Sequence, residues 1–68
     1  MSTEDVVFWL SWCIEEYASS KGMSATDVAQ FFEQNGVLQY LSENAEILHT
    51  QRKSFIFDCV KKFLQNNH

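Results

Sequence analysis

Hydrophobic residues in the N-terminal part of the chain recur with the spacing of one face of a helix. At about 100° per residue they gather into one apolar stripe. Its members are Val6, Leu10, Cys13 and Tyr17, with Trp9 and Ile14 at its margins. Ser2 or Thr3 can cap this helix, with Asp5 three residues after Ser2, and the Ser-Ser-Lys-Gly run at 19–22 can end it. The pattern predicts a first helix that runs to about Ser20 and packs this stripe into the core.

Two further aromatic residues, Phe8 and Trp12, lie on the opposite side of this predicted helix. They are four residues apart and share that side with Glu4, Glu15 and Ser19, where a solvated surface is expected. One interpretation is that the helix lies between two others and is buried on both sides. The other is that Phe8 and Trp12 form an exposed aromatic pair of the type that anchors protein interfaces.

The second and third predicted helices are separated by a turn that contains glycine. Ser24 followed by Asp27 repeats the N-capping signal, and Asn35-Gly36 supplies a residue able to adopt a positive φ at the end of the second helix. Residues 37–44 are then predicted to form a short third helix.

The C-terminal part of the chain again carries apolar residues at helical spacing. An irregular segment at 47–49 is followed by Thr50, which can cap a last helix through about Gln65. The apolar positions of this helix are Phe55, Ile56, Cys59, Val60 and Phe63. The tail at 66–68 is expected to fray. Together the elements predict an all-α fold, a compact bundle of three long helices plus one short helix, in a single domain spanning residues 1–68.

Length and composition limit the classes of function. Sixty-eight residues can build one hydrophobic core, so no separate substrate domain is expected. The chain is 46% hydrophobic and 21% charged, which is typical of a globular protein and not of a disordered one. Because a core of this size supplies only about 3–5 kcal/mol of net stability, association with a partner or a second copy is favoured.

The charge and the longest apolar run bear on the partner and the location. Nine acidic and five basic side chains give a net charge of −4, which disfavours nucleic acid and suits a basic protein, although solubility alone also accounts for it. The apolar run at 6–10 is far shorter than the roughly 20 residues of a membrane span, and the acidic N-terminus is unlike a signal peptide. We therefore expect no membrane association, a cytoplasmic location, and reduced Cys13 and Cys59.

No set of residues has the pattern of a catalytic or metal site. The candidate metal ligands Cys13, Cys59, His49 and His68 show no paired spacing. Both cysteines fall on predicted apolar faces, and the two glycines stand alone and form no phosphate-binding loop. We therefore predict a protein with no enzymatic activity, no metal and no cofactor.

The segment His49-Thr50-Gln51-Arg52-Lys53 concentrates polar side chains around the start of the last predicted helix. Thr50 is explained as an N-cap, and Arg52 and Lys53 can be surface residues. Two cations in a first helical turn oppose the helix dipole, however, which suggests that they contact an acidic group on a partner. This turn is therefore a second candidate binding site.

Several segments of the chain share a pattern with known proteins. They are Cys13-Ile14-Glu15-Glu16-Tyr17, Met23-Ser24 through Val28, Phe32-Glu33 with Gly36 through Leu41, and Leu48-His49-Thr50-Gln51. Through these segments, and the Leu-His-Thr motif above all, the chain resembles a family of short bacterial and phage-borne helical proteins of unknown function. It departs from the family pattern at Arg52, where glycine is expected. The resemblance implies a protein encoded beside toxins that resemble ADP-ribosyltransferases, hence an antitoxin-like or accessory role, and it brings no catalytic residues.

These observations favour a non-enzymatic protein-binding module that masks a partner protein such as a toxin, through Phe8 and Trp12 or through the turn at 49–53. Two alternatives from other classes stay open. Residues 24–41 have the layout of a helix-turn-helix DNA-binding regulator, although the predicted third helix carries no Lys or Arg. The second alternative is a structural homodimer whose surplus apolar faces pair with each other.

Overall fold

Helix α1, which spans Thr3–Lys21, is the longest element of the computed structural model, which describes residues 1–66. At its start, Ser2 Oγ accepts a hydrogen bond from the backbone N–H of Asp5 at 3.2 Å. At its end, Gly22 adopts the left-handed conformation with φ 66°, which favours glycine because it lacks a Cβ atom. Both predicted signals for this helix are confirmed.

The all-α fold class is confirmed, and residues 1–66 contain no strand. The helices after α1 are α2 (Ala25–Gln34), α3 (Val37–Glu43), α4 (Ala45–Leu48) and α5 (Lys53–Asn66). Ser24 caps α2 by accepting from the backbone N–H of Asp27 at 3.1 Å, and Gly36 separates α2 from α3 with φ 74°. The three long helices and the short α3 therefore agree with the prediction.

Two local predictions in the second half of the chain are wrong. Residues 45–48, part of which was expected to be irregular, form the short helix α4, since the backbone N–H of His49 reaches the carbonyl of Ala45 at 2.9 Å. The last helix begins at Lys53 and not directly after Thr50. The predicted fraying of the tail concerns Asn67 and His68, which lie outside the described residues, whereas Asn66 belongs to α5.

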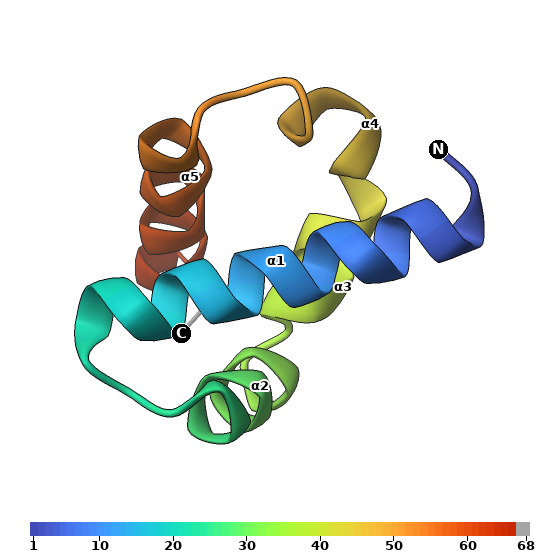
Figure 1. The fold of residues 1–68 in the computed structure, drawn as a ribbon. Helices are drawn as coiled ribbons and strands as arrows, with labels where there is room; N and C mark the ends of the chain where they lie inside the picture. Colours follow the sequence, from blue (N-terminus) through green and yellow to red (C-terminus); the bar gives the residue numbers. More distant parts are fainter. Residues whose placement is uncertain (67–68) are drawn as a thin grey trace.

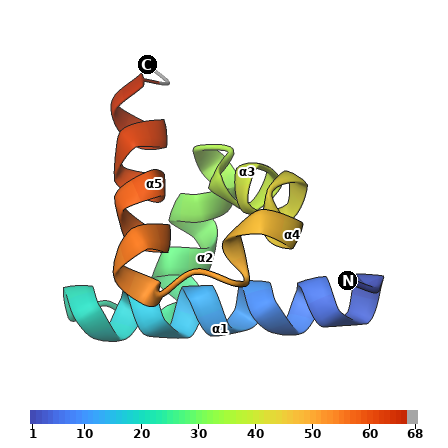
Figure 2. The same ribbon diagram turned by 90° about the horizontal axis from the view of Figure 1, so that it is seen from above.

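The short helix α3 lies at the centre of the arrangement and contacts α1, α2, α4 and α5 (Figure 1). Helix α1 runs along one side of the molecule, and α5 extends away from it (Figure 2). In that view α3, α4 and α5 all lie on the same side of α1. One side of α1 is therefore packed against the domain, and the opposite side faces outward.

The core is formed where the apolar faces of the helices meet around α3. Its fully buried side chains are Cys13, Val28, Phe32, Val37, Leu41, Ile56 and Val60. The ring of Tyr17 on α1 packs edge-on against Phe32 of α2 at 4.9 Å and against Phe57 of α5 at 5.4 Å between centroids. Such aromatic pairs add to area burial, so Tyr17 joins three helices at one point. Of the predicted apolar stripe of the first helix, Leu10, Cys13 and Tyr17 face this core, as do Trp9 and Ile14 at its margins, whereas Val6 is half-buried.

None of the helices in residues 1–66 combines the length and the apolar character that crossing a membrane requires.

Candidate functional site

The aromatic face, which we define as Phe8 and Trp12 on α1, is not covered by the rest of the domain. Phe8 is 75% exposed and Trp12 is 41% exposed. The interpretation that the first helix is buried on both sides is therefore wrong, because the packed helices leave the outward side of α1 open (Figure 2). The other interpretation, an exposed aromatic pair, agrees with the structure. Trp12 is more than half buried and so also contributes to packing.

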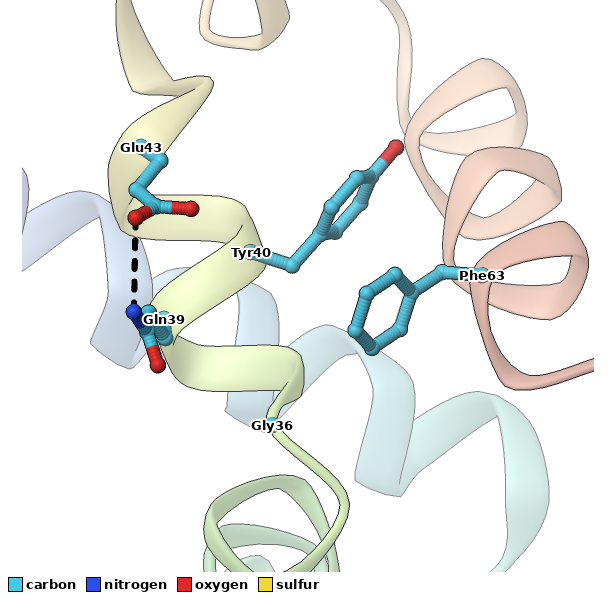
Figure 3. Close-up of a pocket in the computed structure, with 5 residues that line it drawn as sticks. All are labelled: Gly36, Gln39, Tyr40, Glu43 and Phe63. Carbon is cyan, nitrogen blue, oxygen red and sulfur yellow. Dashed lines mark hydrogen bonds between the residues drawn. The ribbon is translucent and has the colours of Figure 1, made fainter. Parts of the chain in front are cut away.

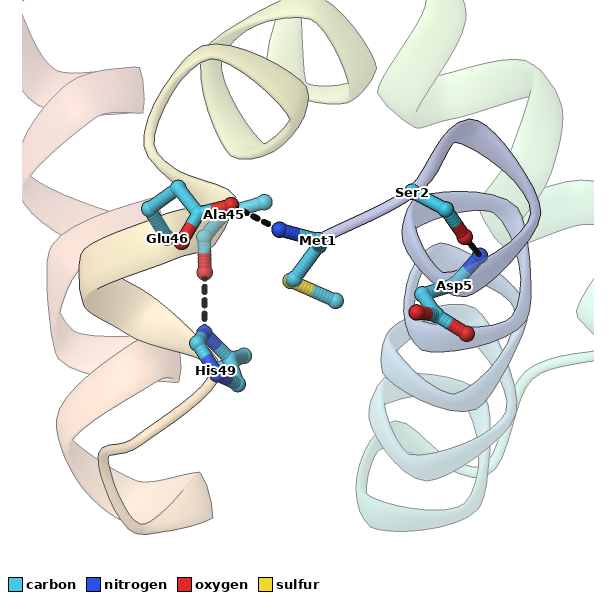
Figure 4. A network of polar contacts seen from close by, with 6 residues as sticks. All are labelled: Met1, Ser2, Asp5, Ala45, Glu46 and His49. Atoms are coloured by element: carbon cyan, nitrogen blue, oxygen red, sulfur yellow. Dashed lines mark hydrogen bonds and ion pairs between the residues drawn. The ribbon is translucent and has the colours of Figure 1, made fainter.

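The turn at 49–53 lies between α4 and α5, and its first two side chains bind the end of α4. His49 Nδ1 lies 2.8 Å from the carbonyl oxygen of Ala45, and because a carbonyl only accepts, this nitrogen carries the proton of that hydrogen bond (Figure 4). Thr50 Oγ1 donates to the carbonyl of Ile47 at 2.8 Å. The carbonyl of Ala45 also accepts the backbone N–H of His49, so the His49 ring is a second donor to it. Thr50 supplies a donor to the carbonyl of Ile47, near the end of α4, where carbonyls lack partners within the helix.

This arrangement corrects the role predicted for Thr50 and gives the Leu-His-Thr pattern a local explanation. Thr50 is not the N-cap of α5, because its hydroxyl is used at the C-terminal end of α4. Leu48, directly before it, is 4% exposed and belongs to the core. Gln51 is exposed, and its side-chain amide donates to Thr50 Oγ1 at 3.4 Å. The motif therefore packs one residue and closes a helix with the next two.

The two cations of the turn differ in their surroundings. Lys53 Nζ forms a salt bridge with Glu16 Oε1 of α1 at 2.8 Å, so the acidic group that this lysine contacts belongs to its own chain. Arg52 is exposed, and its carbonyl accepts the backbone N–H groups of Phe55 at 3.1 Å and Ile56 at 3.2 Å in the first turn of α5. Lys53 thus joins the start of α5 to α1 in spite of the unfavourable helix dipole.

The salt bridge also brings the two predicted sites next to each other. Phe8, Trp12 and Glu16 follow one another at intervals of four residues, so they form one row along α1. Four residues of helix span about 6 Å along the axis. Trp12 and Glu16, the residue that binds Lys53, are therefore about 6 Å apart along α1. The aromatic face and the turn at 49–53 therefore adjoin through Glu16.

A second ion pair joins the start of α1 to α4. The ammonium group of Met1 binds the carboxylate of Glu46, as Figure 4 shows. The hydrogen bond and the positive charge of that ammonium group lower the pKa of Glu46, and His49 contributes further in the same direction. Glu46 is highly exposed, so the pair is a surface contact that positions α4 beside the start of α1.

A pocket between α3 and α5 was not predicted from the sequence. Its lining residues are Gly36, Gln39, Tyr40, Glu43 and Phe63 (Figure 3). The rings of Tyr40 and Phe63 stack with centroids 4.5 Å apart, and Gln39 Nε2 donates to Glu43 Oε2 at 3.3 Å. Burial raises the pKa of the Tyr40 hydroxyl, and the neighbouring Cys59 adds to that shift. Glu43 is the sole carboxylate among the lining residues. Because the pocket is formed by two helices, the pattern within either helix alone could not have predicted it.

Of the candidate nucleophiles and metal ligands, Cys13 belongs to α1, Cys59 to α5, and His49 follows α4, while His68 lies outside the described residues. Cys13 and Cys59 are both free thiols. Cys13 is fully buried, and burial raises its pKa to about 12, which keeps it in the unreactive thiol form. Within residues 1–66, no three His, Cys, Asp or Glu side chains are grouped as ligands of a metal ion.

The segment considered for DNA binding folds as α2 and α3. The two helices are connected by Asn35 and Gly36 alone. Val37 and Leu41 of α3 are fully buried, so the outward side of this helix is left to residues such as Gln39 and Glu43. None of these carries the positive charge that contacts phosphates.

Comparison with known proteins places the chain in a family. It belongs to the protein family of unknown function DUF3791, which matches residues 8–67. The matched region includes the aromatic face and the whole turn at 49–53. No curated protein and no solved structure matches the chain.

Proposed function

We propose that this chain is a non-enzymatic, cytoplasmic protein-binding module that holds or masks a partner protein through its aromatic face. The observation that carries the proposal is the exposure of Phe8: its side chain is 75% exposed, on the outward side of the 19-residue helix α1. Aromatic residues, Phe included, are enriched at protein interfaces relative to the rest of the surface. The adjoining turn at 49–53 supplies Gln51 and Arg52 as polar groups at the edge of the surface.

A toxin is the partner that the sequence resemblance suggests, which would make the module antitoxin-like or accessory. Such a role requires binding without chemistry, and a small domain that presents one apolar surface can cover a groove or active site of a larger protein. Two features support this role: Cys13 is fully buried, and His49 Nδ1 is bound to the backbone carbonyl of Ala45.

The proposal is tested by affinity purification of the tagged full chain from its native host, followed by mass spectrometry. We expect one stoichiometric partner, retained by the wild-type protein and lost with Phe8→Ala. Truncating an interface aromatic of this kind costs about 2 kcal/mol or more, which is roughly a thirtyfold loss of affinity. Val7→Ala is the matched control, because Val7 is 55% exposed on the same helix but points about 100° away from Phe8.

Recovery of no stoichiometric partner, or equal recovery with Phe8→Ala and the wild type, would contradict the proposal. The antitoxin-like role has its own test, which is co-expression with the product of the neighbouring gene. We expect growth inhibition by that product to be relieved by the wild type and by Val7→Ala, but not by Phe8→Ala. A partner that binds through Phe8 but is not toxic would support the protein-binding function and refute the antitoxin-like role.

The alternatives are decided by two further measurements. A helix-turn-helix regulator would shift promoter DNA at low salt, which the exposed residues of α3 do not favour. A structural homodimer would show a concentration-dependent mass in light scattering.

A further inference from the structure

The outward side of α1 carries negative charge around the aromatic face. Glu4 and Asp5 precede Phe8 by four and three residues, and Glu15 follows Trp12 by three, so each carboxylate neighbours one of the two rings on the helix surface. All three acidic residues are exposed, and within residues 1–66 none of them forms an ion pair. The aromatic face therefore has an acidic rim formed by Glu4, Asp5 and Glu15.

The stability of α1 explains only part of this rim. Acidic residues in the first turn, here Glu4 and Asp5, favour the positive end of the helix dipole. Glu15 lies in the second half of the helix, where the dipole gives no such benefit, and the neighbouring Glu16 already supplies the partner for Lys53. Before Lys21, helix α1 contains no basic side chain that could balance the rim.

The charge of the rim discriminates among the possible occupants of this surface. A second copy of the chain would place the acidic rim of one α1 against that of the other, and like charges that face each other across an interface are unfavourable. A membrane surface with anionic lipids attracts Lys and Arg and repels carboxylates. A partner that brings apolar side chains flanked by cations satisfies both the rings and the rim.

We propose that the aromatic face binds a basic amphipathic helix of the partner protein. Its apolar stripe packs on Phe8 and Trp12, and its Lys or Arg side chains face Glu4, Asp5 and Glu15. A helix suits this surface because the two rings lie one turn apart along α1, which matches an apolar stripe at helical spacing on an opposing helix. This inference rests on the proposed protein-binding function and names the chemistry of the partner.

The test uses a display library of 20-residue random peptides selected on the full-length chain at low salt. We expect the enriched peptides to have a net positive charge and apolar residues at positions i, i+3 or i+4, and i+7. Their affinity should fall roughly tenfold for the chain carrying Glu4→Gln, Asp5→Asn and Glu15→Gln, as expected when three exposed ion pairs are lost, and it should fall with rising salt. Phe8→Ala should abolish the enrichment. Far-UV circular dichroism of each variant verifies the fold.

The outcomes separate this inference from the proposed function. Enriched peptides that are neutral or acidic but still require Phe8 would overturn the basic helix and leave the protein-binding surface standing. Basic peptides that bind Phe8→Ala as tightly as the wild type would overturn the surface, and with it the proposed function. A library without enriched members, or equal affinity for the triple amide variant, counts against the basic helix.

Discussion

Replacing Phe32 and Phe8 by alanine makes the same chemical change at a buried and at an exposed position. Phe32 is fully buried and packs edge-on against Tyr17 at 4.9 Å. Truncation of a buried Phe costs about 3–5 kcal/mol, which is as large as the roughly 3–5 kcal/mol of net stability that a core of this size supplies. Phe32→Ala should therefore leave much of the protein unfolded at room temperature.

Phe8→Ala should have little effect on the free energy of unfolding. Phe8 is 75% exposed, so about 50 Å² of its roughly 200 Å² is buried, which corresponds to about 1.2 kcal/mol. Alanine is the better helix former by about 0.5 kcal/mol, which leaves a net loss below about 1 kcal/mol. Trp12 is the less suitable probe, because it is 41% exposed and its truncation also removes buried area.

Urea denaturation followed by far-UV circular dichroism measures both variants against the wild type. A loss of more than about 2 kcal/mol on Phe8→Ala, with an unchanged dependence on urea, would show that the ring belongs to the core in solution. The aromatic face would then not be available to a partner. A Phe32→Ala protein as stable as the wild type would refute the packing on which the comparison depends.

Three further predictions concern the thiols, a helix cap and a surface ion pair. Cys13, whose pKa burial raises to about 12, should react with a thiol reagent at mildly alkaline pH only after denaturation, so the native protein should show at most the reaction of Cys59. Ser24→Ala should remove the cap of α2, cost about 1 kcal/mol and lower Tm by roughly 4–8 °C in calorimetry. The lowered pKa of Glu46 means that its pair with Met1 stabilises the fold above the unfolded-state pKa and is lost as the pH falls through the folded-state pKa. An NMR titration of the Glu46 carboxyl carbon should accordingly give a pKa below that of a glutamate in a short peptide.

The features predictable from the sequence depend on residues close together in the chain. Ser2 and Ser24 each cap a helix by a bond to a backbone N–H three residues later, and Gly22 and Gly36 take the positive φ that their places require. These are short-range interactions, and their chemistry is specific to a few residue types. The start of α5 was misplaced because a threonine hydroxyl can serve either end of a helix, and only the fold places Thr50 at the end of α4.

Whether Phe8 and Trp12 are exposed depends on contacts between segments far apart in the chain, so the sequence alone did not decide between the two interpretations of these residues. Helical periodicity placed Phe8 and Trp12 away from the core stripe, but whether another helix covers them is decided by how α2 to α5 pack against α1. The salt bridge between Glu16 and Lys53, which are 37 residues apart, had no signal in either segment. The unfavourable cation at the start of α5 did indicate an acidic contact, which proved to be intramolecular.

The position of the aromatic face on a single, fixed helix bears on how it can bind. Both rings belong to α1, whose start is closed by Ser2 and joined to α4 through Met1, and whose second half is joined to α5 through Glu16. In the proposed interaction, a partner would meet two aromatic residues whose backbone positions on α1 are set before contact, and no loop would need to be ordered. Binding costs less conformational entropy when one surface is preorganised, so two aromatic side chains can contribute a larger share of their contact energy to affinity. In the proposed role, a domain with so small a core would therefore hold its partner without refolding.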